Sequence, residues 1–244
     1  MRKLILLSLV TFTLSMVSFS SEYFEDMFKI IDNNSSSLRS SMNIFDPSNE
    51  GIREEYMTLG LDKKLDFEVF KQAVDGFKKV KKKKRNVLTI IDFSSSSSEK
   101  RFYVIDFDKN TVLYDTYVAH GKNSGNNYAT EFSNSIDSNM SSLGFYLTGY
   151  TYEGSNGYSL KLYGLESDIN DNAEARSIVI HGADYASPEF LRSNGHLGRS
   201  LGCPALPLEE YAQIIDELKG GSVVFIYAKD KSYQENSRYV ENEA

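Results

Sequence analysis

The hydrophobic pattern changes its period part-way along the chain. Between residues 66 and 79 the apolar positions recur at helical spacing, at Phe70, Ala73, Val74 and Phe77. Asp66 precedes them and is expected to cap the helix, because its side chain can accept a hydrogen bond from a free N–H of the first turn. The wider segment 21–85 is therefore predicted to be a helical N-terminal region.

From residue 86 onward the pattern is that of strands. The runs NVLTIIDF, RFYVIDFD and TVLYDTYVA are rich in β-branched and aromatic residues between turn signals. LGFYLTGYTYEG and YSLKLYGLE flank Asn156-Gly157, a pair typical of tight hairpin turns. The apolar run SIVIHGA predicts a buried strand that ends at His181, and SVVFIYA predicts a last strand.

Two short helices are expected among the later strands. The first has Ser187 as its cap, a proline in its first turn and Gly195 after its end, and the second covers about residues 208–219. Residues 230–244 are polar and are expected to form a frayed tail. The predicted fold class is mainly β with flanking helices, in one domain over residues 86–229.

Residues 1–20 have the composition of a secretory signal peptide. Arg2 and Lys3 precede an apolar run, and small residues suited to cleavage follow as far as Ser20. An uncleaved anchor helix is the alternative, but the run is short for crossing a bilayer and is interrupted by Ser and Thr. We therefore expect export, with no stable membrane insertion once the leader is removed.

Composition excludes several classes of partner. The chain carries 27 basic and 34 acidic residues, a formal net charge of −7, which disfavours nucleic acid. One cysteine and three scattered histidines lack the spacing of a metal site, so no metal is expected. The glycines of HGKNSGNN form no phosphate-binding fingerprint, and no cofactor is expected. The oligomeric state is left open.

Cys203 is the only cysteine, and exported proteins usually contain cysteines in pairs as disulfides. Either this thiol is reactive, or it is a small buried apolar residue. A nucleophilic role requires the thiolate, and an isolated thiol supplies only a few per cent of it at neutral pH. A reactive Cys203 therefore needs a base or a cation beside it.

Three histidines could be that base. His181 ends a buried strand, where its ring can be held rigidly, while His196 follows the end of a predicted helix and His120 ends another strand. Each could instead be a structural histidine with satisfied hydrogen bonds. Around the thiol, the N–H groups of Gly202 and Cys203 could point at an oxyanion.

The residues around Cys203 resemble those of a known family. Ile180-His181-Gly182 followed by Ser200-Leu201-Gly202-Cys203 is similar to the His-Gly and Ser-x-Gly-Cys signature of the murein L,D-transpeptidase catalytic domain, also called YkuD-like. The stretches VAHGKNSGNNYATEFSN, SSLGFYLTG and HGADYASPEFLRSNGHLGRSLGCPALP resemble one exported branch with a GRSxGCPAL motif. The resemblance covers residues 86–229 and implies the β-sandwich or barrel of that family.

The resemblance also implies a chemistry. Such an enzyme acts on peptidoglycan stem peptides in the bacterial periplasm or cell envelope, through a thioester on Cys203 that forms as D-alanine leaves. The acyl group then passes to an amine, which makes a cross-link, or to water, as in an L,D-carboxypeptidase. His181 is implied as the base, with His196 second and His120 as a supporting candidate. Gly202 is implied in the oxyanion turn, and the carbonyl or hydroxyl of Ser200 in orienting an imidazole.

Two departures from the family pattern bear on substrate binding. Many members have a histidine where this chain has Leu201, and an arginine or asparagine where it has Ala205. The expected carboxylate clamp is then Arg199, with Arg192 as the second candidate, since a guanidinium matches a carboxylate bidentately.

Other functions remain open from the sequence. NlpC/P60-type and papain-like enzymes place the cysteine before the histidine, the reverse of the order in this chain, and sortases use an arginine shortly after the cysteine. A non-catalytic cell-wall-binding protein with the same fold is the principal alternative, because a fold does not guarantee activity.

Overall fold

The computed structural model describes residues 49–240. The chain divides into two units, residues 1–51 and 52–244, and the sheet with its flanking helices belongs to the second unit. The predicted leader and the segment 21–48 lie outside the described residues. Within 49–240, no helix is both long and apolar enough to span a bilayer.

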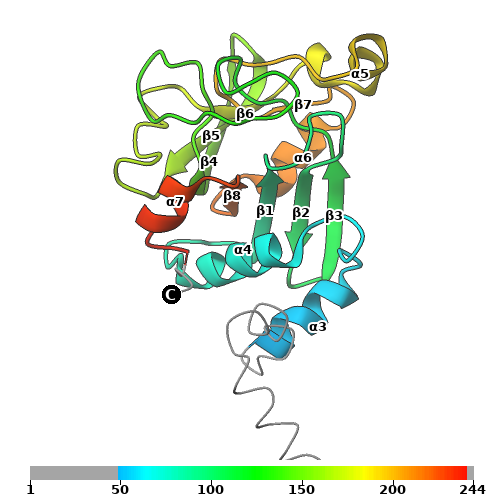
Figure 1. The fold of residues 1–244 in the computed structure, drawn as a ribbon, viewed down its shortest axis with the longest axis vertical. Coiled ribbons are helices and arrows are strands. Elements are labelled where there is room, and N and C mark those ends of the chain that lie inside the picture. Colours follow the sequence, from blue (N-terminus) through cyan, green and yellow to red (C-terminus); the bar gives the residue numbers. More distant parts are fainter. Residues whose placement is uncertain (1–48, 241–244) are drawn as a thin grey trace, which may run out of the picture. The chain divides into compact units, whose positions relative to one another are not determined.

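One sheet of eight strands is the framework of the described residues, in the mainly β class that the sequence predicts (Figure 1). The strands are β1 (Val87–Asp92), β2 (Phe102–Asp106), β3 (Thr111–Thr116), β4 (Gly144–Gly154), β5 (Gly157–Gly164), β6 (Val179–Gly182), β7 (Ala205–Leu206) and β8 (Val223–Tyr227). The helices are α3 (Glu50–Thr58), α4 (Phe67–Lys79), α5 (Pro188–Asn194), α6 (Tyr211–Leu218) and α7 (Lys231–Asn236), with a 3-10 turn η3 at Asp184–Ala186.

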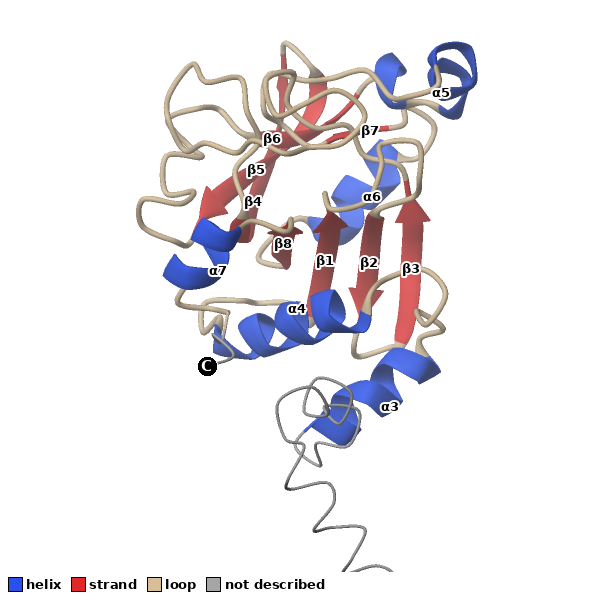
Figure 2. Ribbon diagram, in the orientation of Figure 1, coloured by secondary structure: helices blue, strands red, loops and turns tan. Residues whose placement is uncertain are grey.

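All eight strands belong to one sheet in the order β3-β2-β1-β8-β4-β5-β6-β7. Most neighbours are antiparallel, but β1 pairs with β8 and β6 with β7 in parallel. Every residue of β1 and β8 is buried, which explains why their sequences are continuous apolar runs rather than alternating ones. The helices flank these strands (Figure 2), and this confirms a mainly β fold with flanking helices.

The two edges of the sheet approach each other after β3. The chain that continues from β3 bonds to β7 through paired backbone groups of Ala119 and Ala205, at 2.9 and 3.3 Å. A second bridge joins Gly121 to Ser200. The sheet is thereby nearly closed, and we call this contact of residues 118–122 with residues 200–205 the seam.

Local chemistry sets the ends of the helices as predicted. The Asp66 carboxylate accepts from the N–H of Glu68 at 2.8 Å, which caps α4. At the other end of α4, the Lys83 ammonium donates to the carbonyls of Phe77 and Val80 at 3.0 and 3.1 Å. Lys83 belongs to the basic run of residues 81–85 that follows the helix, and it completes the helix end by binding its free carbonyls.

The predicted cap and hairpin signals are also found. Ser187 accepts from the N–H of Phe190 at 3.1 Å and caps α5, which ends at Gly195 with a φ of 77°. Gly157 opens β5 with a φ of 72°, and Gly154 pairs with it across the hairpin turn.

Two segments pack more extensively than the sequence suggests. α4 contacts β1 and β8, so the described helical segment shares a core with the sheet. The polar segment after residue 229, expected to fray, instead forms α7. The reason is Tyr233, which is buried and donates from its hydroxyl to the buried Glu166 carboxylate at 3.2 Å.

Candidate active site

Strand β6 carries His181, and the turn before β7 carries Cys203. His181 pairs with Ala205 in the parallel β6–β7 ladder, and its N–H donates to the Pro204 carbonyl at 3.4 Å. Val179 precedes His181 by two positions on β6, so the two side chains point to the same face of the sheet. The backbone N–H of Val179 acts on the Cys203 sulfur. The thiol thus lies beside β6, the strand that carries His181.

The thiol is buried and protonated at neutral pH. Cys203 is 8% exposed, and its Sγ donates to the Ser177 carbonyl at 3.7 Å. Burial raises the pKa of the Cys203 thiol, while the Val179 N–H and the Arg176 guanidinium act in the opposite direction. Among the hydrogen bonds of residues 49–240, none joins this sulfur to an imidazole nitrogen.

His181 has the tautomer that a general base requires. Its Nδ1 lies 2.9 Å from the Gly182 carbonyl, which can only accept, so Nδ1 carries the proton and Nε2 has a free lone pair. Burial lowers the pKa of His181, so the ring is neutral at neutral pH. The group that orients the ring is therefore the Gly182 carbonyl.

Ser200 holds the cysteine turn, and none of its hydrogen bonds within residues 49–240 is to an imidazole ring. Its hydroxyl donates to the Cys203 carbonyl at 2.6 Å and accepts from the Gly202 N–H at 3.0 Å. The Ser200 carbonyl accepts from the N–H of Lys122 at 2.8 Å. The serine is therefore a clamp across the turn, because one hydroxyl joins the backbone on both sides of Gly202.

Gly202 cannot be replaced without strain. Its φ is 124°, and a Cβ there would lie 2.7 Å from the Met140 carbonyl oxygen. Of the two N–H groups expected to face an oxyanion, that of Gly202 is engaged by Ser200. In the part of the chain that the structure describes, the N–H of Cys203 has no acceptor. It is the donor available for a developing oxyanion.

The other two histidines differ from His181. His196 is half-buried, and its Nδ1 lies 2.7 Å from the Leu197 carbonyl. No hydrogen bond of the described residues joins its ring to the Cys203 turn. His120 is buried behind the turn, and its Nδ1 lies 2.8 Å from Nη2 of Arg101. A guanidinium can only donate, so Nδ1 of His120 is an acceptor and this ring is not placed as the base.

Both arginines that the sequence suggests for binding a substrate carboxylate lie at the surface. Arg199 is exposed and donates to the carbonyls of Lys122 and Gly125 at 3.4 and 3.2 Å. Arg192 is exposed on α5 and pairs with Glu189. Neither interacts with the Cys203 sulfur in the described structure, although an exposed guanidinium remains accessible to a substrate carboxylate.

Arg176 is the cation that the sequence analysis missed. It is half-buried, acts electrostatically on the Cys203 thiol, and both its Nη atoms are fully engaged by residues 133–142. They donate to the Ser133 carbonyl at 2.7 Å, the Ser142 hydroxyl at 3.1 Å, the Ser138 hydroxyl at 3.2 Å and the Met140 carbonyl at 2.5 Å. Its position in RSIVIHG, just before the strand of His181, was the available signal.

Tyr185, in η3, is a further neighbour of the thiol. Burial and the charge of a Cys203 thiolate raise the pKa of Tyr185 to about 12. Its hydroxyl is therefore neutral at neutral pH. Leu201, one residue after Ser200, is 64% exposed at the same turn.

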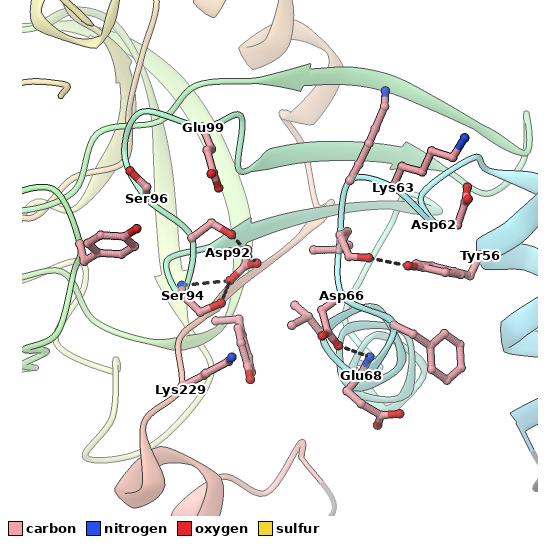
Figure 3. A pocket seen from close by; sticks show the side chains of 17 residues that line it. Tyr56, Asp62, Lys63, Asp66, Glu68, Asp92, Ser94, Ser96, Glu99 and Lys229 are labelled. Atoms are coloured by element: carbon pink, nitrogen blue, oxygen red, sulfur yellow. Dashed lines mark hydrogen bonds between the residues drawn. The ribbon is translucent and has the colours of Figure 1, made fainter. Parts of the chain in front are cut away.

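A cleft of about 800 Å³ is lined by residues of α4, of the loop after β1 and of the segments around them (Figure 3). Asp66 and Glu68 line one side, and Asp92, Ser94 and Glu99 line the other. Its walls come from the start of α4 and from the loop after β1, and Cys203 is not among the lining residues. The described residues contain no group of three histidine, cysteine or acidic side chains placed to hold a metal ion.

One family model and several solved structures match the chain. The sequence model of the family YkuD_2, L,D-transpeptidase catalytic domain, matches residues 61–227. An L,D-transpeptidase from Mycobacterium smegmatis is 16% identical, with 59% of each chain covered and a TM-score of 0.37. L,D-transpeptidase 1 of Mycobacterium tuberculosis is 13% identical, with 59% of this chain and 62% of that one covered and a TM-score of 0.34.

A third solved structure covers more of the chain. The L,D-transpeptidase from Stackebrandtia nassauensis is 13% identical, with 74% of this chain and 77% of that one covered and a TM-score of 0.36. The chain spans about three fifths of the length of the first structures it matches. No curated protein matches it.

Proposed function

The chain belongs to the L,D-transpeptidase catalytic domain family, and we propose that it is a cysteine acyltransferase that acts on peptidoglycan stem peptides. The family match spans both the His181 strand and the Cys203 turn. The observation that supports the mechanism is that β6 carries a neutral His181 with Nε2 free and also lies beside the buried thiol. Donor and acceptor groups for a proton transfer are thus both present in their uncharged forms.

The first half-reaction forms a thioester. Nε2 of His181 takes the thiol proton as Cys203 Sγ attacks the carbonyl between the L-centre of a diamino acid and D-alanine. The free N–H of Cys203 stabilises the oxyanion of the tetrahedral intermediate. The C–N bond then breaks, and the protonated His181 returns its proton to the amine of the departing D-alanine.

The second half-reaction releases the acyl group. An amine of another stem peptide, or water, attacks the thioester carbonyl, and His181 accepts the proton that the nucleophile loses. The C–S bond breaks and the thiol is protonated again. The amine acceptor gives a cross-link and the water acceptor gives a trimmed stem. The exposed Arg199, and after it Arg192, are the proposed partners of the substrate carboxylate.

The neutral resting state determines how the thiol must respond to substrate. In the structure, Sγ donates to the Ser177 carbonyl. Rotation about χ1 of Cys203 would break this hydrogen bond and let the thiol turn toward a substrate. Arg176 favours the thiolate once it forms, because its positive charge acts on the sulfur. The proposal therefore has the imidazole remove the proton during the attack and does not need a preformed ion pair.

The proposed enzyme works outside the cytoplasm. The leader at 1–20 supports export to the periplasm or cell envelope, where stem peptides are found. Sequencing the N-terminus of the protein recovered from cells tests this step. A mature chain that begins near Ser21 is expected, and retention of Met1 in the cytoplasm would contradict it.

The decisive experiment uses defined tetrapeptide muropeptides and mass spectrometry of the products. Wild-type protein is expected to release D-alanine and to give either a cross-linked dimer or a tripeptide. Cys203→Ala is expected to give neither while retaining its circular dichroism spectrum. Turnover by Cys203→Ala at the wild-type rate would refute the proposal.

One observation favours a second candidate, a cell-wall-binding protein without catalysis. The thiol is bonded to a backbone carbonyl and not to an imidazole, as in an inert buried cysteine. Exposure of the folded protein to a carbapenem separates the two candidates. An acyl adduct on Cys203 supports the enzyme, and a folded protein that binds peptidoglycan without forming the adduct supports the binding role.

A further inference from the structure

The cysteine turn is held on both sides by the seam. On the N-terminal side, Ser200 donates its N–H to the His120 carbonyl at 2.9 Å and accepts from the N–H of Lys122 at 2.8 Å. On the C-terminal side, Ala119 and Ala205 exchange two backbone hydrogen bonds. The position of Cys203 is therefore set by the position of residues 118–122, which belong to the opposite edge of the sheet.

Arg101 binds this segment from inside the protein. The side chain is fully buried, with Nε and Nη2 donating to the Val118 carbonyl at 3.2 and 2.9 Å. Nη1 donates to the Ser95 carbonyl at 2.8 Å, and Nη2 also reaches Nδ1 of His120 at 2.8 Å. Burying a guanidinium is costly, and although the charges of Asp92 and Glu99 favour its charged form, no carboxylate within residues 49–240 forms an ion pair with Arg101.

His120 completes the arrangement as an acceptor. Its ring is 1% exposed, and burial together with the adjacent Arg101 lowers the pKa of His120 to about 4. The neutral ring accepts at Nδ1 and carries its proton on Nε2, which is buried and has no hydrogen-bond partner in the described structure. The backbone groups of Gly125 and Asn126 act to raise the pKa of His120. Neither residue, however, reaches Nε2 with the geometry of a hydrogen bond. A buried Nε2–H without a well-formed hydrogen bond has a free-energy cost that an apolar residue at this position would avoid.

We propose that Arg101 and His120 are a positioning pair, which fixes residues 118–122 and through them aligns the Cys203 turn for acyl transfer. Arg101 binds the Val118 carbonyl and the ring of His120. The His120 carbonyl in turn accepts a hydrogen bond from the N–H of Ser200. His120 has no part in the proton transfer. The inference rests on the proposed acyl transfer, but the effect of the pair on the hydrogen bonds of the seam can be measured without that activity.

The test compares two reactions of the same thiol. Alkylation by iodoacetamide requires only a thiolate and access, whereas acylation by a carbapenem also requires the turn N–H to face the tetrahedral oxyanion. We therefore expect His120→Leu to lower the acylation rate by about tenfold to a hundredfold relative to the alkylation rate. Loss of stability alone would not lower that ratio.

Two isosteric variants identify the atom responsible. Asparagine places an oxygen acceptor close to the position of Nδ1, and glutamine places its amide close to the position of Nε2. His120→Asn is expected to restore the ratio of rates to near the wild-type value, and His120→Gln is not. Arg101→Lys, which keeps the charge but loses the fork of donors, is expected to behave like His120→Leu.

Thr148→Val is the matched control for destabilisation. Its hydroxyl is buried and bonds to the Leu218 carbonyl at 2.7 Å and to the N–H of Ser222 at 2.9 Å, far along the sheet from the seam. This variant is expected to lower the melting temperature without changing the ratio. An equal fall of the ratio in Thr148→Val and His120→Leu would overturn the positioning role.

A second measurement keeps the inference independent of the proposed function. Hydrogen exchange at the amides of Ser200 and Lys122 reports the seam directly, because both bonds cross it. Faster exchange at these two amides in His120→Gln than in His120→Asn supports the role of the positioning pair. Equal exchange in wild type and all the seam variants would refute it. If wild type is neither acylated nor active on muropeptides, the proposed function fails. The exchange rates then still show whether Arg101 and His120 hold the seam in place.

Discussion

The chain contains two His-Gly pairs at the ends of extended segments, and they have opposite chemistry. In Ile180-His181-Gly182 the ring donates from Nδ1 to a carbonyl, which leaves Nε2 as a lone pair. In Ala119-His120-Gly121 the ring accepts at Nδ1 from Arg101, which leaves Nε2 as an N–H. Two rings in similar sequence settings thus present a base and a donor, respectively.

The difference teaches that the partner of Nδ1, and not the local sequence, assigns the role of a histidine. His181 meets a carbonyl of the next residue, a contact that β6 itself supplies. His120 meets a side chain from the start of β2, which only the pairing of strands brings close. A strand-end histidine is therefore a candidate base only after its neighbour is known.

The largest effect that can break this comparison is the loss of the proposed base. His181→Gln is expected to reduce acylation of Cys203 by about 10²–10⁴-fold, because the thiol then has no neutral imidazole to take its proton. The acylation rate with a carbapenem, followed by mass spectrometry, measures this. His196→Gln is the control and is expected to change the rate little. The reverse result would make His196 the base.

A smaller effect concerns the free energy of unfolding that depends on the neutral form of His120. The pKa of folded His120 is lowered to about 4, below its unfolded value, so the unfolded chain binds the proton more readily. Stability from this group is complete above the unfolded pKa and is lost as pH falls from about 6.5 to about 4. The loss is on the order of 3 kcal/mol in the free energy of unfolding.

His120→Asn isolates this contribution. Urea unfolding of wild type and variant at pH 7 and pH 4 is expected to give a smaller loss of stability in the variant, since asparagine does not titrate. The other acidic and basic groups contribute equally to both proteins and cancel in the difference. The same loss in both proteins would show that His120 is not held neutral by burial.

A third effect concerns the cation that favours the thiolate. Arg176→Gln is expected to raise the pKa of the Cys203 thiol further, because the guanidinium now lowers it. The pH dependence of alkylation by iodoacetamide should move to higher pH, with slower alkylation at any fixed pH below it. Arg176→Lys keeps the charge and is expected to shift the profile less. Coincident profiles for all three proteins would remove Arg176 from the electrostatics of the site.

The smallest expected effect concerns the clamp across the turn. Ser200→Ala leaves the Cys203 carbonyl and the Gly202 N–H without their shared hydroxyl and is expected to cost about 1–2 kcal/mol of stability. Ser200→Thr retains the hydroxyl and serves as the control. Urea unfolding measures both, and an unchanged midpoint for Ser200→Ala would mean that water replaces the hydroxyl without cost.

The sequence by itself determined much of the local structure. The Asp66 and Ser187 caps, the hairpin at Asn156-Gly157 and the buried strand that ends at His181 all follow from chemistry within a few residues. These features depend on backbone geometry and hydrophobic spacing that neighbouring residues fix. The same local information selected Cys203 and His181 as candidate site residues, and the family match includes both.

The tertiary structure alone determined which groups surround the site residues. Arg101 reaches His120 across paired strands, Arg176 reaches the thiol from the chain before β6, and the thiol bonds to the Ser177 carbonyl. Each contact depends on strand register and on closure of the seam, and no spacing along the chain encodes these. Burial then fixed the charge states, because removing water raises the pKa of a thiol and lowers that of an imidazole.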